Sequence, residues 1–229
     1  MVKEILTIGG RDCIVQGSCN ATIVLIQPVD GHDIEELDKL IAYLLAHTAQ
    51  SFLHVAVPIK RWNEELTPWQ APPVFGKIPF GNGASATLFY IERELIPFLN
   101  EAYSFQNTTQ FVLGGYSLAG LFALWVAYQP SVFIATVSAS PSAWYKDWLA
   151  YAELHQPKVS HIYLSLGDTE DHTKTKIMQT IKLDVYRLAE IFKQKGVDTI
   201  LEWNAGNHFQ DNGTRTAKGF VWAMKSIDC

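Results

Sequence analysis

The sequence predicts an α/β protein with a mostly parallel sheet that is covered by helices. Short β-branched runs alternate with longer segments of helical periodicity along the whole chain, which is the pattern of successive βαβ units. No repeat, low-complexity tract or Pro/Gly-rich linker interrupts this alternation, and 229 residues is a common length for one such domain. We therefore expect a single domain over residues 1–229.

The chain begins with a predicted hairpin. Residues 5–8 and 13–16 flank the turn Gly9-Gly10 and are expected to form an antiparallel edge of the sheet. Residues 21–26 form an almost continuously apolar run, as expected of a strand that is buried on both faces. The next strand is expected over residues 52–59.

A helix is expected between these two strands, because Asp33 and Glu36 have the spacing of a capping box. Its apolar residues fall on one stripe, formed by Ile34, Leu37, Ile41 and Leu44. The rest of the chain continues the alternation. Further strands are expected over residues 110–114, 133–137, 161–166 and 199–203. Further helices are expected over residues 84–105, 118–128, 174–195 and 214–227.

Residues 60–83 fit neither pattern, and a long connection in a compact domain is usually functional. Trp62 and Trp69 offer flat apolar surface to a substrate, and Arg61 offers an anchor for an anionic or phenolic group. The alternative is that the two tryptophans only hold the loop against the core.

Composition excludes several classes of protein. Apolar residues make up 48% of the chain and charged residues 18%, which excludes a disordered chain or a coiled coil. The net charge is −5 without a basic block, so neither nucleic acid nor a membrane surface is an expected partner. The longest apolar stretch, residues 118–128, is too short to span a bilayer. The N-terminus lacks a signal-peptide pattern, so we expect a cytoplasmic protein.

Cysteine usage agrees with a reducing compartment. The three cysteines are Cys13, Cys19 and Cys229, and none forms a C-x-x-C pair. An odd number without paired spacing predicts neither a disulfide framework nor a thiolate zinc site.

One motif combines a nucleophile with a suitable backbone. Gly115-Tyr116-Ser117-Leu118-Ala119 lies between a predicted apolar strand and a helix of small residues. A serine on such a turn projects above the sheet, and the helix N-terminus below it favours developing negative charge. The usual second glycine is replaced by Ala119, which is still small. The alternative interpretation is a serine that only caps the helix.

Two other predicted strands end in residues that could complete this chemistry. Asp168, Glu170 and Asp171 follow the strand over residues 161–166, where side chains line the ligand crevice of open α/β sheets. They could orient an imidazole or only cap the next helix. Among seven histidines, only His208 lies between the last strand and the last helix. The order of serine, acid and histidine after separate strands is that of α/β-hydrolases.

The chain resembles α/β-hydrolases of the "putative esterase" superfamily, which holds enterochelin-esterase-like and esterase-D-like enzymes. The resemblance implies an α/β-hydrolase fold with helices on both faces of the sheet. It also implies a catalytic triad whose acid follows its strand's final glycine by three residues, which here is Glu170. Asp168 and Asp171 stay as alternatives, and some members use a Ser–His dyad. The matching segments span nearly the whole chain and are residues 61–69, 114–120, 166–170 and 206–208.

The resemblance further implies two backbone donors for an oxyanion. One is the Leu118 N–H, directly after the nucleophile. The other follows the early central strand, where the family commonly has a His-Gly pair. This chain has Gln27-Pro28-Val29-Asp30 at that place. Because proline has no N–H, the expected second donor is Val29.

These observations predict a serine esterase that acts on small or exposed carboxylic esters through Ser117, His208 and Glu170 and an acyl-enzyme. Tyr116, Arg61, Trp62 and Trp69 are expected to contact the substrate. No metal or organic cofactor is expected, and the small-molecule ester is the one partner implied. The alternatives are an acyltransferase or thioesterase with the same triad, and a non-catalytic binding module with a hydrolase fold. The oligomeric state stays open.

Overall fold

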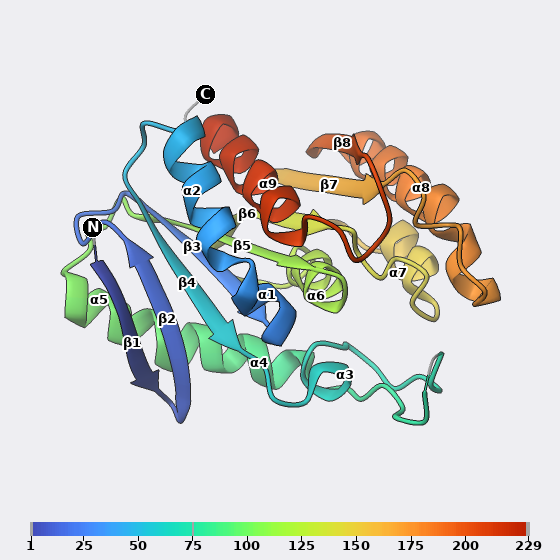
Figure 1. Cartoon of the computed structure of the whole chain (residues 1–229), viewed down its shortest axis with the longest axis horizontal. Helices are drawn as coiled ribbons and strands as arrows, with labels where there is room; N and C mark the ends of the chain where they lie inside the picture. The colour runs from blue at the N-terminus through green and yellow to red at the C-terminus, as the bar shows by residue number, and fades with distance from the viewer. Residues whose placement is uncertain (1, 75, 228–229) are drawn as a thin grey trace.

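A computed structural model describes residues 2–74 and 76–227. In this part of the chain, eight strands form one sheet in the order β1-β2-β4-β3-β5-β6-β7-β8 (Figure 1). The pairs β1–β2 and β2–β4 are antiparallel. All other neighbouring pairs in this order, from β4–β3 to β7–β8, are parallel. The predicted fold class is therefore confirmed. The strands are β1 Val2–Ile8, β2 Arg11–Gly17, β3 Ile23–Val29, β4 Phe52–Pro58, β5 Gln110–Tyr116, β6 Phe133–Ala139, β7 His161–Gly167 and β8 Asp198–Asn204.

Helices cover both faces of the sheet (Figure 1). Helices α2 and α9 pack together on one face, while α6 packs on β5 and β6, and α8 on β7 and β8, on the other. The helices are α1 Gly31–Glu35, α2 Leu37–His47, α3 Trp62–Glu65, α4 Ala84–Tyr90, α5 Ile96–Tyr103, α6 Leu118–Val126, α7 Trp148–Leu154, α8 Ile181–Gln194 and α9 Asn212–Ile227.

The sheet separates two large apolar cores, and Val29, Leu37 and Ala56 form a third, small cluster in the described residues. The larger core contains Leu121 and Leu188 from α6 and α8, and the second contains Leu44 and Phe220 from α2 and α9. Strand β3 is buried at all seven residues, which explains why its sequence is almost continuously apolar. Because both faces of the central strands are covered, their carboxyl ends are held rigidly at one edge of the sheet, where the candidate site lies.

The expected capping box is wrong by three residues. Asp30 is the N-cap of α1, and its side chain accepts a hydrogen bond from the Asp33 N–H while the Asp33 carboxyl accepts from the Asp30 N–H. The chain then bends at Glu36 and starts a second helix, α2. Ile34 is 38% exposed, so the expected apolar stripe is buried only from Leu37 onward.

Four other segments differ from expectation. The long helix after Gly83 contains a π-helical turn over Ile91–Leu95, between α4 and α5. The connection over residues 60–83 contains α3 and a β-bridge between Ala71 and Phe80. Helix α8 starts at Ile181, later than expected, after a 3₁₀ turn, and α7 has no counterpart in the sequence analysis.

The cysteines and the helix lengths can be compared with expectation for the described residues. Cys13 and Cys19 are free thiols, one buried and one exposed, and Cys229 lies outside the described residues. No helix in the described ranges has enough consecutive apolar residues to cross a bilayer.

Candidate active site

Ser117 occupies a strained turn between β5 and α6. Its φ is +58° and its ψ is −118°, a conformation that costs a non-glycine residue about 1–3 kcal/mol. The turn is also sterically tight, because a Cβ atom on Gly115 would lie 2.5 Å from the Ala119 Cβ. Gly115 is therefore required, while the methyl group of Ala119 fits. The geometry matches the predicted turn that projects a serine above the sheet.

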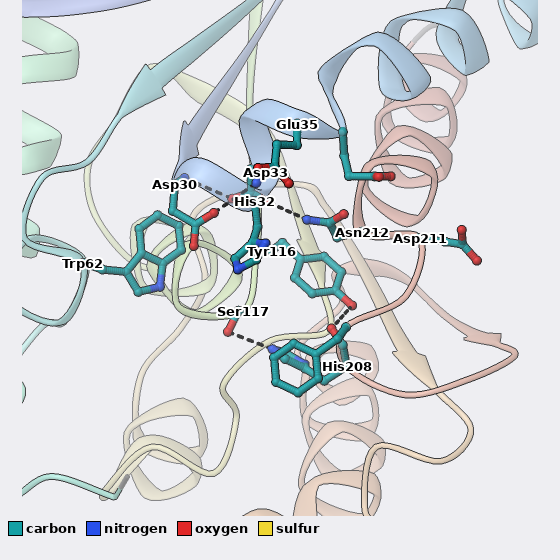
Figure 2. A pocket seen from close by; sticks show the side chains of 12 residues that line it. Asp30, His32, Asp33, Glu35, Trp62, Tyr116, Ser117, His208, Asp211 and Asn212 are labelled. Carbon is teal, nitrogen blue, oxygen red and sulfur yellow. Dashed lines mark hydrogen bonds between the residues drawn. The ribbon is translucent and has the colours of Figure 1, made fainter. Parts of the chain in front are cut away.

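Three side chains from three separate loops form a continuous chain of hydrogen bonds. Ser117 Oγ lies 3.0 Å from His208 Nε2, and His208 Nδ1 lies 2.8 Å from Glu170 Oε2. Figure 2 shows the serine hydroxyl pointing toward the imidazole. Each residue follows the carboxyl end of a different strand, namely β5, β7 or β8. The sheet topology thus brings together residues that are 91 positions apart in the sequence.

Glu170 is buried and fully engaged. Its Oε1 atom accepts hydrogen bonds from Ser140 Oγ at 2.6 Å and from the Gly167 N–H at 2.7 Å. Burial alone would raise the pKa of Glu170, but the hydrogen bonds from His208, Ser140 and Gly167 hold this pKa below its usual value. The carboxylate is therefore ionised at neutral pH and favours the tautomer in which His208 Nδ1–H donates to it.

The other two acidic candidates have different contacts. Asp168 Oδ1 accepts a hydrogen bond from the Gly206 N–H at 2.8 Å, at an exposed position. Asp171 pairs with Lys182 at 2.8 Å, and this contact lowers the Asp171 pKa. Of the three carboxylates, Glu170 is the one that contacts His208.

Arg215 is part of the site, although sequence reasoning did not find it. Arg215 is only 1% exposed, and its Nη1 atom donates to Glu170 Oε1 at 3.0 Å and to the Tyr116 hydroxyl at 3.1 Å. Its Nη2 atom donates to the Ala205 carbonyl at 2.8 Å. The sequence did place a charged residue on the buried face of the last helix, four positions before Gly219. A buried arginine requires a partner, so this position could have indicated a buried carboxylate near it.

Tyr116 contacts the histidine and the arginine at once. Its hydroxyl donates to the His208 carbonyl at 3.0 Å, and its ring centroid lies 5.2 Å from the imidazole. Burial and the Glu170 charge raise the Tyr116 pKa, so the hydroxyl stays protonated. Tyr116 therefore links the backbone of the His208 loop to Arg215, and its ring lines the pocket (Figure 2).

A cavity of about 270 Å³ lies above Ser117 and His208. Its wall comes from the β3–α1 turn, helix α1, Trp62 and the start of α9 (Figure 2). Trp62 is half-buried and lines the cavity. The lining residues are Asp30, His32, Asp33, Glu35, Glu36, Trp62, Tyr116, Ser117, His208, Phe209, Asp211 and Asn212.

Two expected substrate contacts lie outside this cavity. The Trp69 ring packs on Trp148, with centroids 6.2 Å apart, and its Nε1–H donates to the Lys146 carbonyl. These contacts match the alternative in which Trp69 holds the loop against the core. Arg61 is exposed and lines a neighbouring cavity on the loop, while its backbone N–H donates to Glu65.

The two expected oxyanion donors have different surroundings. Leu118 is the first residue of α6, where an N–H group has no partner within the helix. Val29 is fully buried at the end of β3, and its carbonyl accepts from the Ile59 N–H at 3.0 Å. Because the N–H and C=O of a strand residue point to the same side, the Val29 N–H faces β4 rather than Ser117. This geometry does not support Val29 as the second donor.

Asp33 is a second buried carboxyl group at this edge of the sheet. Its Oδ1 atom accepts a hydrogen bond from Asn212 Nδ2 at 3.0 Å. Burial and the nearby Asp30 charge raise the pKa of Asp33 to about 7. The sequence marked Asp33 only as a helix cap and gave no signal for this role.

The order of the strands and the strained serine turn after β5 define an α/β-hydrolase. A family model described as "Putative esterase" matches residues 29–212. The chain belongs to this family and is an esterase. Among curated proteins, none matches the chain significantly.

Several solved structures are similar to this chain in fold. An IroE-like serine hydrolase from Shewanella oneidensis has a TM-score of 0.77 and 15% identity, over 95% of this chain and 76% of that one. The siderophore hydrolase EstB from Aspergillus nidulans has a TM-score of 0.73 and 18% identity, over 100% and 96%. The enterobactin esterase FES from Shigella flexneri has a TM-score of 0.72 and 12% identity, over 99% of this chain but only 59% of that one.

Proposed function

We propose that this esterase cleaves small or exposed carboxylic esters through a triad of Ser117, His208 and Glu170 and an acyl-enzyme intermediate. The observation that carries the proposal is the hydrogen-bond chain of 3.0 Å and 2.8 Å that links these residues. It begins at a serine held in a strained turn and ends at an ionised, buried glutamate.

The mechanism follows from the positions of these atoms. His208 Nε2 accepts the proton of Ser117 Oγ as this oxygen attacks the ester carbonyl carbon. His208 then gives that proton to the leaving alcohol oxygen, and the acyl group stays on Ser117. A water molecule, deprotonated by His208, attacks the acyl-enzyme carbonyl carbon, the bond to Ser117 Oγ breaks, and His208 returns the proton to Ser117 Oγ as the carboxylic acid is released. Glu170 keeps the imidazole oriented and stabilises its positive charge in both steps.

The developing oxyanion needs donors near Ser117. The Leu118 N–H at the start of α6 is one donor in this proposal, and removing one such donor costs roughly 2.7–4 kcal/mol of barrier stabilisation. In place of Val29, we assign the second donor to the first turn of α1. The N–H groups of Gly31 and His32 have no partner within a helix, and His32 lines the same cavity as Ser117.

The substrate size is argued from the cavity. A volume of about 270 Å³ is slightly below the range of typical small-molecule sites, which span roughly 300–1,000 Å³. We expect kcat/KM to be highest for p-nitrophenyl esters of short acyl chains. A maximum at long-chain acyl esters would contradict this part of the proposal.

The direct test is hydrolysis of p-nitrophenyl acetate and butyrate by the wild type, Ser117→Ala and His208→Ala. We expect kcat to fall by roughly 10⁴-fold or more in both variants, because nucleophile and base act as a unit. His172→Ala is the matched control, because His172 is exposed. Among the described residues, its one ion-pair partner is Asp171. Full activity in Ser117→Ala would overturn the proposal.

A further inference from the structure

We infer that the catalytic pocket selects esters that carry a positively charged ammonium group. This inference rests on the proposed esterase function and concerns the wall opposite the nucleophile. That wall is formed by the β3–α1 turn, helix α1 and the start of α9 (Figure 2). Five carboxyl side chains line it, namely Asp30, Asp33, Glu35, Glu36 and Asp211.

Within the cavity, little positive charge balances these carboxyl groups, although Lys39, which does not line the cavity, interacts electrostatically with Glu36 and Asp211. Neither lysine nor arginine is present among the described residues that line the cavity. Glu36 pairs with Lys39 at 2.6 Å. For the other four carboxyl groups, no ion pair within 4.0 Å is formed with any described residue. A concave site whose walls carry one sign of charge concentrates ligands of the opposite sign.

The state of Asp33 supports this view of the pocket. Its hydrogen-bond donors are neutral, namely the Asn212 amide and the Asp30 N–H. The raised pKa of this carboxyl has burial and the charge of Asp30 as its main causes. The negative charge of Asp30 therefore disfavours the ionised form of Asp33. A cation bound in the pocket would reduce this repulsion between the two carboxylates.

An aromatic ring completes the recognition surface. Trp62 and Asp30 both line this cavity, so that an indole ring and a carboxylate belong to the same recognition surface. A carboxylate next to an aromatic ring attracts ammonium groups, because the charge and the ring quadrupole act in the same direction. Lys60 and Arg61 line the neighbouring cavity on the loop instead. The small volume above Ser117 places the ammonium group within a few carbon atoms of the scissile carbonyl.

The test compares pairs of esters that differ only in charge. One pair is acetylcholine and its analogue with a quaternary carbon in place of nitrogen. The other is the p-nitrophenyl ester of trimethylammonio-butyrate and its quaternary-carbon analogue, so that both sides of the ester bond are probed. We expect kcat/KM to be about tenfold or more higher for the cation in at least one pair. This advantage should shrink at high salt, because salt screens exposed charges.

Two substitutions test the residues while preserving the backbone. Asp30→Asn removes a charge but keeps a good N-cap for α1. Asp211→Asn removes a charge at φ +54°, a conformation that asparagine also adopts. We expect each to lower the cation-to-neutral ratio of kcat/KM by roughly three- to tenfold. The controls are Asp38→Asn, whose carboxylate pairs with Lys3, and Asp147→Asn, at φ +59°. Both should leave the ratio unchanged.

The possible results separate this inference from the proposed function. Hydrolysis of the neutral esters without any advantage for the cationic ones would overturn the inference and leave the esterase mechanism standing. A cation advantage that survives both Asp30→Asn and Asp211→Asn would also overturn it, because the assigned wall would then not cause the selectivity. Failure to hydrolyse any of the esters, with no labelling of Ser117 by a fluorophosphonate, would overturn both.

Discussion

Glu170 and Asp33 are two buried carboxyl groups at the same edge of the sheet, and their pKa values are shifted in opposite directions. Glu170 accepts hydrogen bonds from His208, Ser140 and the Gly167 N–H, and its pKa is lowered. Asp33 has neutral donors and a carboxylate neighbour, Asp30, and its pKa is raised to about 7. Burial is similar for the two residues. The difference shows that the partners, rather than the depth of burial, decide whether a buried acid stays charged.

The opposite shifts predict opposite effects of pH on stability. Because the Glu170 pKa is lower in the folded state, its contribution to stability is present above the usual glutamate pKa and is lost as pH falls through the folded-state value. Because the Asp33 pKa is higher in the folded state, the fold loses stability as pH rises from about 4 to about 7. The following predictions use this contrast, beginning with the largest effect.

Glu170→Gln tests the charged member of the pair. The amide keeps the shape but presents donors to His208 Nδ1, which disfavours the productive tautomer. We expect kcat on p-nitrophenyl butyrate to fall by roughly 10²–10⁴-fold. Asp168→Asn is the control, since asparagine can still accept from the Gly206 N–H, and its kcat should change less than about threefold. Equal losses in the two variants would contradict the assignment of the acid.

Arg215→Met tests the buried ion pair that Glu170 forms with the last helix. The pair is buried, with side chains only 2% and 3% exposed, and breaking such a pair costs about 3–5 kcal/mol. We expect a loss of this size in the free energy of unfolding, measured by urea denaturation. Lys218→Met removes a more exposed pair with Glu202 from the same helix and should cost about 1 kcal/mol or less. Similar losses in both would show that Arg215 does not support Glu170.

Asp33→Asn tests the raised pKa. The wild type should lose stability relative to this variant by about 3 kcal/mol between about pH 5 and pH 8. The measurement is the difference in unfolding free energy across that range. Asp38→Asn, an exposed carboxylate that pairs with Lys3, should show no such trend. A pH-independent difference for Asp33→Asn would mean that its pKa is not raised.

The two loop tryptophans extend the comparison to apolar residues. Trp69→Ala removes packing against Trp148 and should lower the free energy of unfolding by about 2 kcal/mol while KM changes little. Trp62→Ala removes a side chain from the cavity wall and should raise KM a few-fold with a smaller loss of stability. A larger loss of stability in Trp62→Ala and a larger rise in KM in Trp69→Ala would contradict these assignments.

Sequence reasoning found the parts of the site that have local signals. The turn around Ser117 requires small residues at fixed spacing, and Glu170 and His208 each follow a strand, so residue type and position pointed to them. Ser140 and Asp33 carry no such signal, and for Arg215 the sequence shows only a charged residue on the buried face of the last helix, without its partners. Their roles depend on contacts between loops that are far apart in sequence, such as the 45 positions between Glu170 and Arg215.

The fold was predictable for a similar reason. The prediction failed where two local sequence patterns compete. The apolar run of β3 predicts that this strand is buried on both faces, and the Gly9-Gly10 turn predicts the hairpin of β1 and β2. The helix after β3 was misplaced because Asp30, Asp33 and Glu36 give overlapping capping patterns, and only the observed hydrogen bonds select Asp30. The orientation of the Val29 N–H likewise depends on pairing with β4, which the local sequence does not specify.

The central claim is that Ser117 is the nucleophile activated by His208 and Glu170. The most direct measurement is labelling by a fluorophosphonate, followed by mass spectrometry of the peptides, on the wild type and Glu170→Gln. The account predicts a single adduct on Ser117, formed at least about a hundredfold more slowly in Glu170→Gln. An adduct on another residue, or labelling of Ser117 at an equal rate in both proteins, would contradict it.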